Sequence, residues 1–216
     1  MALNKSTGNM YEFVTHTYNT IKGQCYHDCA YCFMKRWGKL NPVRLDEREL
    51  KADLGTGNFI FVGSSCDMWA QNIPDEWIIK TLKHCAKFDG NKYLFQTKNP
   101  KNIRRMLPTD SHVCVTLESD IHYPEIMRNS PTPKERVAEM RLIRNPLYIT
   151  IEPIMKFTYE FAQMLIECGA EQINIGADSG NNKLPEPDAE SIKWLIATLA
   201  PFTKVHTKKN LKRLLK

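Results

Sequence analysis

Residues 23–33 read GQCYHDCAYCF and place three cysteines within eight residues. Thiolates are soft ligands that favour iron–sulfur clusters, zinc or copper(I). A structural zinc site needs four ligands, and the fourth would have to be His27, which lies between two of the cysteines. Three thiolates on a four-iron cluster leave one iron open to a substrate or cofactor. The spacing therefore favours a [4Fe-4S] cluster at Cys25, Cys29 and Cys32, with zinc as the alternative.

The remaining cysteines do not extend this group. Each lies singly among apolar neighbours, which is typical of a reduced, buried thiol: Cys66, Cys85, Cys114 and Cys168. With 42% hydrophobic and 25% charged residues the composition is that of a globular protein. No run approaches the roughly 18 apolar residues of a membrane span, and residues 1–9 lack the apolar core of a secretion signal. We therefore expect a cytoplasmic protein with no membrane partner.

The net charge of +6 is concentrated at the C-terminus. Residues 204–216 contain six lysines and arginines and no acid, so the rest of the chain is balanced. A basic C-terminal segment can contact phosphates. It can equally be a solvated helix end, where cations are favourable. The sequence leaves both interpretations open.

Six short apolar runs predict strands, and their continuous apolar character indicates burial on both faces, as in a parallel sheet. These runs are Glu12–Tyr18, Asn58–Val62, Tyr93–Thr97, His112–Leu117, Leu147–Glu152 and Gln172–Ile175. Helical patterns follow the runs and begin near Asp46, Pro74, Asn99, Pro131, Thr158 and Pro187. The three longest irregular segments are the cysteine loop, Ser119–Ser130 and Ser179–Pro187.

Alternating strands and helices predict an α/β fold with right-handed crossovers. An eight-unit barrel usually needs about 250 residues. Six units in 216 residues fit a partial (β/α)6 barrel of parallel strands better, with a doubly wound sheet as the alternative. We expect residues 1–216 to form a single domain. In either architecture the chemistry belongs at the C-terminal ends of the strands.

The Cys-x3-Cys-x2-Cys spacing, with the aromatic Tyr31 before the third cysteine, resembles the radical SAM superfamily. The resemblance continues in order along the chain and points to the branch that contains spore photoproduct lyase and its small, often virus-encoded relatives. The segments that carry it are residues 17–19, 61–64, 95–100, 116–120, 151–153, 175–180 and 208–211. It implies a radical SAM core in which S-adenosylmethionine binds the open iron and is cleaved reductively to a 5′-deoxyadenosyl radical.

The resemblance also implies residues around the cofactor. Tyr31 would pack beside the adenine. Gly63, Ser64 and Ser65 would hold the methionine amino group, because glycine permits close backbone approach. Lys98 would pair with the methionine carboxylate. The alternatives are a core-facing ring at Tyr31, an ordinary turn at 63–65 and a surface lysine at position 98.

Polar residues at three further strand ends are candidates for cofactor or substrate contacts. Glu118 and Ser119 could hydrogen-bond the ribose hydroxyls. Glu152 and Asp178 could bind cofactor or substrate, or could pair structurally with Lys98, Lys208 or Lys209.

Cys66 is the candidate catalytic residue. In spore photoproduct lyase a cysteine in the corresponding region gives a hydrogen atom to the product radical. The equivalent position here is Ser64, and Cys66 follows two residues later. The hypothesis is that Cys66 is a hydrogen donor, and the alternative is a buried thiol.

The sequence therefore predicts a radical SAM enzyme that acts on a nucleobase or nucleotide, or on DNA. Its partners would be a nucleic acid or nucleotide substrate and an external one-electron donor of the flavodoxin or ferredoxin type. Two alternatives stay open: a radical SAM enzyme acting on a peptide or small metabolite, and a non-enzymatic zinc- or cluster-binding interaction protein.

Overall fold

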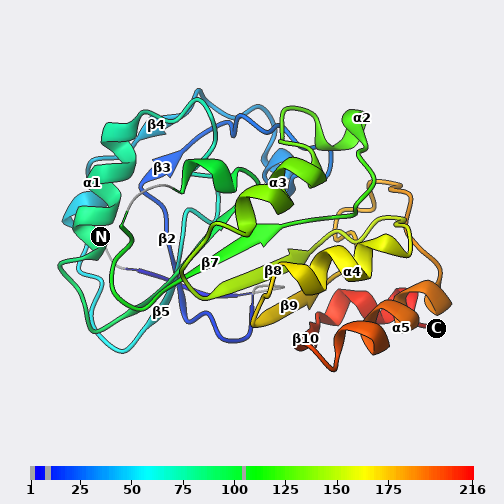
Figure 1. Cartoon of the computed structure of the whole chain (residues 1–216). Coiled ribbons are helices and arrows are strands. Elements are labelled where there is room, and N and C mark those ends of the chain that lie inside the picture. Colours follow the sequence, from blue (N-terminus) through cyan, green and yellow to red (C-terminus); the bar gives the residue numbers. More distant parts are fainter. Residues whose placement is uncertain (1–2, 8–10, 104–105) are drawn as a thin grey trace.

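A curved sheet of mostly parallel strands forms the centre of the molecule (Figure 1). The computed structural model describes residues 3–7, 11–103 and 106–216, so part of the N-terminal segment 1–9 lies outside the described residues. Within these residues the main sheet has eight strands in the order β1-β2-β5-β6-β7-β8-β9-β10. Their bounds are β1 Asn4–Lys5, β2 His16–Tyr18, β5 Phe59–Val62, β6 Lys92–Thr97, β7 Ser111–Thr116, β8 Leu147–Ile151, β9 Gln172–Ile175 and β10 Lys204–Thr207.

In the main sheet, all neighbouring strands from β2 through β5 to β10 are parallel, and β1 pairs antiparallel with β2. The α/β class and the parallel core predicted from the apolar runs are therefore confirmed. The first of the predicted strands, Glu12–Tyr18, corresponds to β2 and begins at His16 rather than at Glu12. The residues before it turn inward, because Tyr11, Val14 and Phe13 pack against Phe61 inside the curve of the sheet.

A seventh parallel strand, β10, was not predicted from the sequence. Lys204 pairs with Gln172 and Thr207 pairs with Ile175, so the basic C-terminal segment extends the sheet instead of trailing into solvent. The pattern KVHT is half-exposed and carries charge, which is how edge strands discourage pairing with other chains. The segment continues into a 3-10 helix, η4 Lys209–Leu214, whose Leu211 is fully buried.

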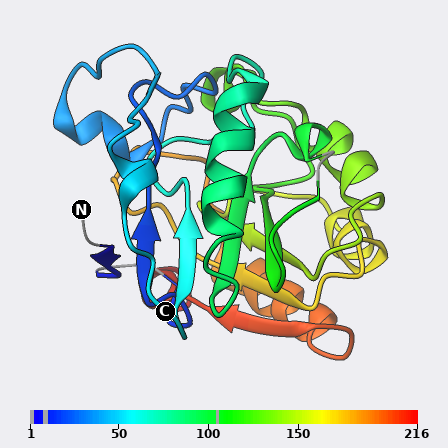
Figure 2. The ribbon, with the colours of Figure 1, turned by 90° about the vertical axis from the view of Figure 1, so that its left-hand side faces the viewer.

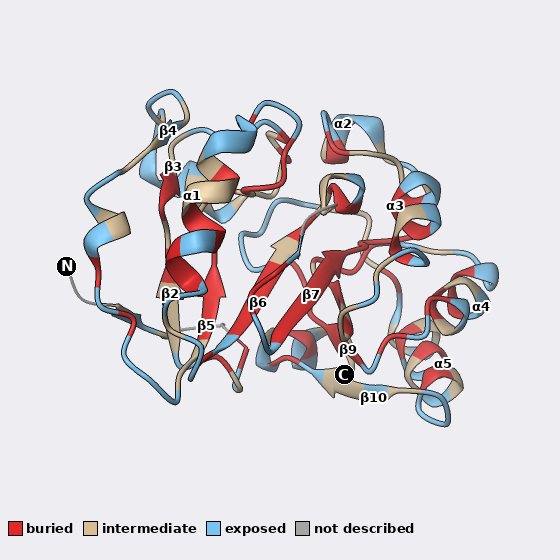
Figure 3. Ribbon diagram, turned by 60° about the vertical axis from the view of Figure 1, so that its left-hand side comes forward, coloured by how far each residue is buried: buried red, intermediate tan, exposed pale blue. Residues whose placement is uncertain are grey.

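The helices cover the outer face of the sheet, as Figures 1 and 3 show. The α-helices are α1 Asp75–Cys85, α2 Pro124–Met127, α3 Pro133–Met140, α4 Glu160–Glu167 and α5 Ala189–Leu199. Their apolar faces pack on the strands in one large core; Ile78, Leu165 and Leu195 are examples. α3 begins with a capping box formed by Thr132 and Glu135, and Asp188 caps α5.

The helix predicted at Asp46 is much shorter than its sequence pattern indicated, whereas the helix predicted at Asn99 was expected to be short. The pattern that begins at Asp46 forms only the 3-10 helix η2 Glu49–Lys51, and the pattern at Asn99 forms η3 Pro100–Asn102. Asp46 instead accepts a hydrogen bond from Lys22, which holds the segment against the short pair β3 Ile21–Lys22 and β4 Arg44–Leu45. The segment 119–130, expected to be irregular, contains α2.

No helix within the described ranges combines the length and apolar character that a membrane crossing requires.

Candidate active site at the C-terminal ends of the strands

The inner face of the sheet changes from apolar to polar toward the C-terminal ends of its strands. Side chains two residues apart share a face of a strand. Apolar Phe61 and Leu94 line the inner face low in the sheet. Gln96, one step above Leu94, accepts a hydrogen bond from the Tyr11 hydroxyl at 2.8 Å and donates to Thr116 at 3.0 Å. This polar layer leads to the strand ends, where the predicted site residues lie.

The cysteine loop begins after β3 and turns sharply at Gly23. Gly23 has φ +112°, and a Cβ there would lie 2.5 Å from the carbonyl oxygen of Pro42, so only glycine fits. Within the loop the Asp28 amide donates to the Cys25 carbonyl and the Cys32 amide to the Cys29 carbonyl. Every cysteine of the chain is free, including these three.

Cys25 and Cys66 interact directly. A hydrogen bond from the Cys66 thiol lowers the pKa of Cys25 to about 6, against the opposing effect of burial. The same bond raises the pKa of Cys66 well above its usual range, and burial adds to this. The thiolate is the metal-binding form of cysteine, so the direction of the shift at Cys25 favours a role as a ligand.

Cys29 and Cys32 complete the group. Cys29 is buried, with its sulfur 3.5 Å from the hydroxyl oxygen of Ser130. Burial raises the pKa of Cys32, the nearby Lys98 charge opposes this, and the charges of Cys29 and Cys25 add to it. The three thiols are thus close enough to influence one another electrostatically.

His27, the candidate fourth ligand of a zinc ion, is instead hydrogen-bonded to Asp67, with 2.9 Å between His27 Nε2 and Asp67 Oδ2. The same Asp67 oxygen accepts from the hydroxyl of Thr97 and the amide of Lys98, each at 2.9 Å. The other oxygen accepts from the Trp69 amide. Burial raises the pKa of Asp67, but these hydrogen bonds, led by that from His27, lower it overall.

Asn19, at the end of β2, organises the turn that follows β5. Its Oδ1 accepts from the Ser65 amide and from both serine hydroxyls, at 3.0–3.2 Å, and its Nδ2 donates to Ser64. Gly63 has φ +80°, where a side chain would be strained, and its amide donates to Tyr18. The turn predicted to hold the methionine amino group is therefore a defined loop beside Cys66.

Lys98, Tyr31 and Glu118 lie together. The Lys98 ammonium is 5.4 Å from the centre of the Tyr31 ring, and the Tyr31 hydroxyl donates to Glu118. Burial lowers the pKa of Lys98, but the charges of Cys29 and Glu118 raise it overall, so the side chain stays cationic. Lys98, the cation predicted for the methionine carboxylate, therefore lies close enough to Cys29 and Cys32 to interact with them electrostatically.

Glu118 is fully buried and paired with Arg136, at 2.7 Å between Arg136 Nη1 and Glu118 Oε2. Burial raises the pKa of Glu118, but Arg136, Lys98 and the Tyr31 hydrogen bond lower it to about 2. Both oxygens are thus engaged inside the protein, so in this conformation the side chain braces Tyr31. A ribose contact at Glu118 stays a prediction.

Ser119 and Asp178 each organise a loop. The Ser119 hydroxyl donates to the Lys156 carbonyl at 2.7 Å and accepts from the Ile121 amide. The Asp178 carboxylate accepts from the Gly180 amide at 2.9 Å and from both nitrogens of Asn182. Neither arrangement tests the predicted cofactor contacts, which stay predictions.

Glu152 pairs with Lys208, at 2.6 Å between the charged atoms, which is one of the structural pairings considered from the sequence. Asn210 donates to the other Glu152 oxygen at 3.0 Å, and the Lys208 ammonium lies 4.6 Å from the centre of the Tyr11 ring. A Cβ at Gly176 would lie 2.7 Å from Glu152 Oε1. Gly176 therefore makes room for this carboxylate.

The basic C-terminal segment is partly used for internal ion pairs. Lys208 is only 6% exposed, and Arg213 pairs with Glu186, with 2.7 Å between Arg213 Nη1 and Glu186 Oε2. Its remaining lysines, such as Lys204 and Lys212, are exposed. Two of the six positive charges of this segment are therefore already paired within the protein, which weakens its interpretation as a phosphate-binding segment.

The donor set fits a thiolate-bound cluster better than a single zinc ion. In the described part of the chain, no three His, Cys, Asp or Glu side chains are placed to hold one metal ion. A four-iron cluster has a different requirement, because each thiolate binds its own iron. The loop supplies three free thiols, the ligand type that such a cluster uses, and His27, the candidate fourth ligand of zinc, is bound to Asp67.

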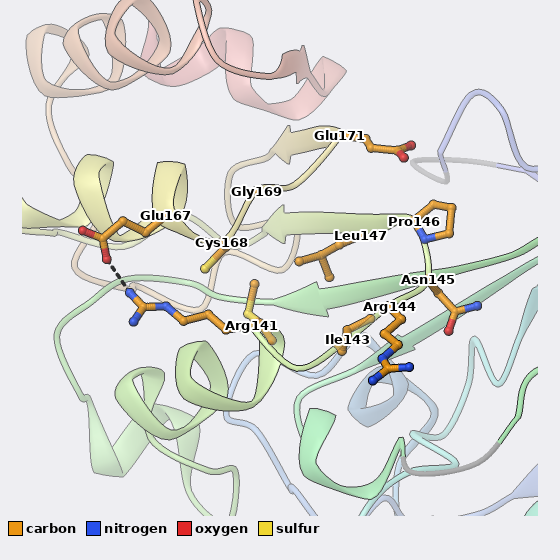
Figure 4. A pocket seen from close by; sticks show the side chains of 11 residues that line it. Arg141, Ile143, Arg144, Asn145, Pro146, Leu147, Glu167, Cys168, Gly169 and Glu171 are labelled. Carbon is orange, nitrogen blue, oxygen red and sulfur yellow. Dashed lines mark hydrogen bonds and ion pairs between the residues drawn. The ribbon is translucent and has the colours of Figure 1, made fainter.

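A surface pocket of about 320 Å³ lies at the opposite end of β8 (Figure 4). Its lining includes Leu147, the first residue of β8, and Cys168, and Arg141 pairs with Glu167 at its side. None of the predicted site residues lines it. The pocket is therefore separate from the strand ends where the cysteine loop lies.

Two residues that hold the site together lie outside every motif segment that the sequence analysis singled out: Asp67 and Arg136. Each acts through partners distant in the sequence, as in the pair of Asp67 and Lys98 or that of Arg136 and Glu118. Asn19 and Asn210 lie in the motif segments 17–19 and 208–211, but no role was assigned to either from the sequence.

The chain was compared with protein families, with curated proteins and with solved structures. The sequence profile of a family described as "Protein of unknown function (DUF5131)" matches residues 9–197. No curated protein matches the chain in sequence.

Solved structures of similar fold include spore photoproduct lyase complexed with dinucleoside spore photoproduct, with a TM-score of 0.66 and 10% identity over 94% of this chain and 78% of that one. A mutant of the same enzyme with bound AdoMet and the dinucleoside gives 0.67 and 10% over 95% and 80%. SuiB of Streptococcus suis bound to S-adenosylmethionine gives 0.52 and 14%, over 88% of this chain and 46% of SuiB.

At such identities the likeness concerns the fold, and for the fold it confirms the resemblance found in the sequence motifs. The chain belongs to the family described as protein of unknown function (DUF5131), and it has the radical SAM fold of spore photoproduct lyase.

Proposed function

We propose that this protein is a radical SAM enzyme that holds a [4Fe-4S] cluster through Cys25, Cys29 and Cys32 and acts on a nucleobase or nucleotide. The observation that carries the proposal is the position of three free thiols in one loop at the C-terminal ends of parallel strands, beside the cation Lys98. Chemistry in barrels of this kind belongs at that edge of the sheet. A cluster bound there would supply the electron that cleaves S-adenosylmethionine reductively.

The residues around the loop fit the groups of S-adenosylmethionine. Lys98 supplies a charge-assisted contact for a carboxylate. The turn at Gly63, Ser64 and Ser65, fixed by Asn19, presents backbone carbonyls and hydroxyls to an ammonium group. Tyr31 offers a ring next to the third cysteine. Similar folds bind AdoMet in spore photoproduct lyase and S-adenosylmethionine in SuiB, which supports the same cofactor here.

A nucleobase or nucleotide substrate is supported by the fold neighbour that carries a dinucleoside. The inner polar layer contains amide and hydroxyl groups of the kind that bind base edges, in Gln96 and Thr116, which in this structure bond to each other. The electron would come from an external one-electron donor.

Cys66 is proposed as the hydrogen donor to the product radical. The residue is 3% exposed, and its hydrogen bond with Cys25, together with burial, raises the pKa of its thiol. In this step the S–H bond of Cys66 breaks homolytically, the hydrogen atom goes to the substrate radical, and the unpaired electron remains on the Cys66 sulfur.

The decisive experiment is anaerobic reconstitution, reduction with dithionite, addition of S-adenosylmethionine and assay of 5′-deoxyadenosine. We expect product from the wild type and none from the triple variant Cys25→Ala/Cys29→Ala/Cys32→Ala. Cys168→Ala is the matched control, since it removes a thiol remote from the loop. Stimulation by dinucleotides or DNA, and not by peptides, supports the substrate assignment. A reconstituted wild type that binds iron and yields no 5′-deoxyadenosine would refute the enzyme proposal.

A further inference from the structure

The segment that follows Cys32 exposes large aromatic rings. The 3-10 helix η1, Phe33–Trp37, contains no buried residue, and the rings of Phe33 and Trp37 are 51% and 68% exposed. Large aromatic side chains are usually mostly buried, and a local group of exposed ones indicates an interaction surface. Figure 2 shows this segment projecting at the upper left, beside β2 and away from β8 and β9.

The two rings are held together by Arg36. The guanidinium carbon of Arg36 lies 5.6 Å from the centre of the Phe33 ring and 5.2 Å from that of Trp37. Both distances are within the range of cation–π attraction. Phe33, Arg36 and Trp37 therefore form one surface feature, and aromatic residues with arginine are the residue types that dominate binding energy at protein interfaces.

The chain that follows Cys29 and contains this feature is positively charged. Lys35, Lys39 and Arg44 are exposed, and the sequence contains no acid between Cys29 and Leu45. The adjacent Asp28 is neutralised by Lys35, at 2.9 Å, and by Arg128. We call Phe33, Lys35, Arg36, Trp37, Lys39 and Arg44 the aromatic–basic patch.

We propose that the aromatic–basic patch docks an acidic one-electron donor protein, which reduces the cluster. This inference rests on the proposed function. The patch begins at the residue after Cys32, a half-exposed cysteine of the cluster loop, so a donor seated there lies close to the acceptor. One electron leaves the reduced donor and enters the cluster, and no atom is transferred at the patch.

The form of the patch suits such a partner. Electron-transfer complexes are small and transient, and opposite charge increases their association rate and selects the partner. A basic surface with an aromatic centre is complementary to an acidic protein with an apolar rim around its redox group. The same rings could stack on single-stranded nucleic acid. The position next to Cys32, at the edge of the molecule, favours the donor.

The test compares two reductants and two charge-reversal variants. Arg36→Glu/Lys39→Glu alters the patch. Lys83→Glu/Lys87→Glu, which alters two exposed lysines at the end of α1, is the matched control. Calorimetry measures binding of oxidised flavodoxin, and 5′-deoxyadenosine is assayed with reduced flavodoxin and with dithionite.

We expect the patch variant to bind flavodoxin about 10-fold more weakly at low salt and to lose a similar factor in the flavodoxin-driven rate. The dithionite-driven rate should change less than about twofold, and the control should match wild type. Unchanged flavodoxin binding in the patch variant would overturn the docking proposal. So would weakened binding of oligothymidine with unchanged binding of flavodoxin. Failure of wild type with dithionite would refute the proposed function instead, while the calorimetry still reports on docking.

Discussion

The imidazole of His27 and the carboxylate of Asp67 are joined by a hydrogen bond of 2.9 Å between Nε2 and Oδ2. His27 lies between the first two cysteines of the loop, whereas Asp67 also accepts from the side chain of Thr97 and the backbone of Lys98. One buried carboxylate therefore connects the cysteine loop, the turn after β5 and the end of β6. It fixes the loop relative to the cation Lys98.

Asp67→Asn should weaken cluster binding. The amide nitrogen of asparagine cannot accept the bonds that Oδ2 accepts, so the loop loses its anchor. Removal of groups that orient metal ligands costs about 10- to 100-fold in metal affinity, and we expect iron loss to a chelator to accelerate accordingly. The control is Asp53→Asn, since Asp53 accepts a bond from the Gly55 amide in an exposed turn. Equal iron retention in both variants would show that Asp67 has no positioning role.

The sequence located the strands and the cysteine loop well, because each depends on neighbouring residues. Gln172–Ile175 has isoleucine at positions 173 and 175 and forms β9 with the predicted bounds. The cysteine spacing needs no tertiary information. Local patterns were sufficient for these features.

The remaining features depend on contacts that spacing does not encode. β10 escaped prediction because an edge strand is half-exposed and its charges resemble a solvated tail. Arg136 lies in a predicted helix whose pattern does not indicate its burial, and it is fully buried against Glu118. The helix pattern at Asp46 failed because Lys22 and the short β3–β4 pair determine that segment.

Gly176→Ala should destabilise the fold through Glu152. The new methyl group would lie 2.7 Å from Glu152 Oε1, so the carboxylate must leave Lys208 or Asn210, and overpacking of this kind costs about 1–3 kcal/mol. Urea denaturation measures the effect. In the double variant Gly176→Ala/Glu152→Ala the methyl group has room. The stability lost by the double variant should therefore be smaller than the sum of the losses of the two single variants, by a coupling of about 0.5–3 kcal/mol. Strict additivity would contradict this account.

Arg136→Met should be more destabilising than substitution of an exposed arginine. Glu118 would keep a buried charge without its partner, and breaking a buried pair in this way costs about 3–5 kcal/mol. Arg48→Met is the control, because Arg48 is 80% exposed in its side chain. The free energy of unfolding at neutral pH distinguishes the two variants. Equal values would mean that Arg136 does not stabilise the carboxylate.

Stability should fall in acid because of Glu118. Its folded pKa of about 2 is below the ordinary value of 4.5, so the ionised form contributes stability above about pH 4.5. That contribution is lost as the pH falls from 4.5 toward 2. The free energy of unfolding of Glu118→Gln should depend less steeply on pH in this interval, although the variant is less stable at pH 7. Identical slopes for wild type and variant would exclude Glu118 as a source of the acid sensitivity.

Cys66 can be tested separately from the cluster ligands, because its two roles predict different results. As a hydrogen donor, its exchangeable thiol carries solvent deuterium into the product. Cys66→Ala should therefore abolish deuterium incorporation from D2O and divert the product radical to other products, while 5′-deoxyadenosine still forms. If Cys66 serves only to donate a hydrogen bond to Cys25, then Cys66→Ser should preserve both cluster binding and product ratio. Deuterium incorporation that is the same in wild type and Cys66→Ala would end the donor hypothesis, since no thiol at position 66 would then be needed for the transfer.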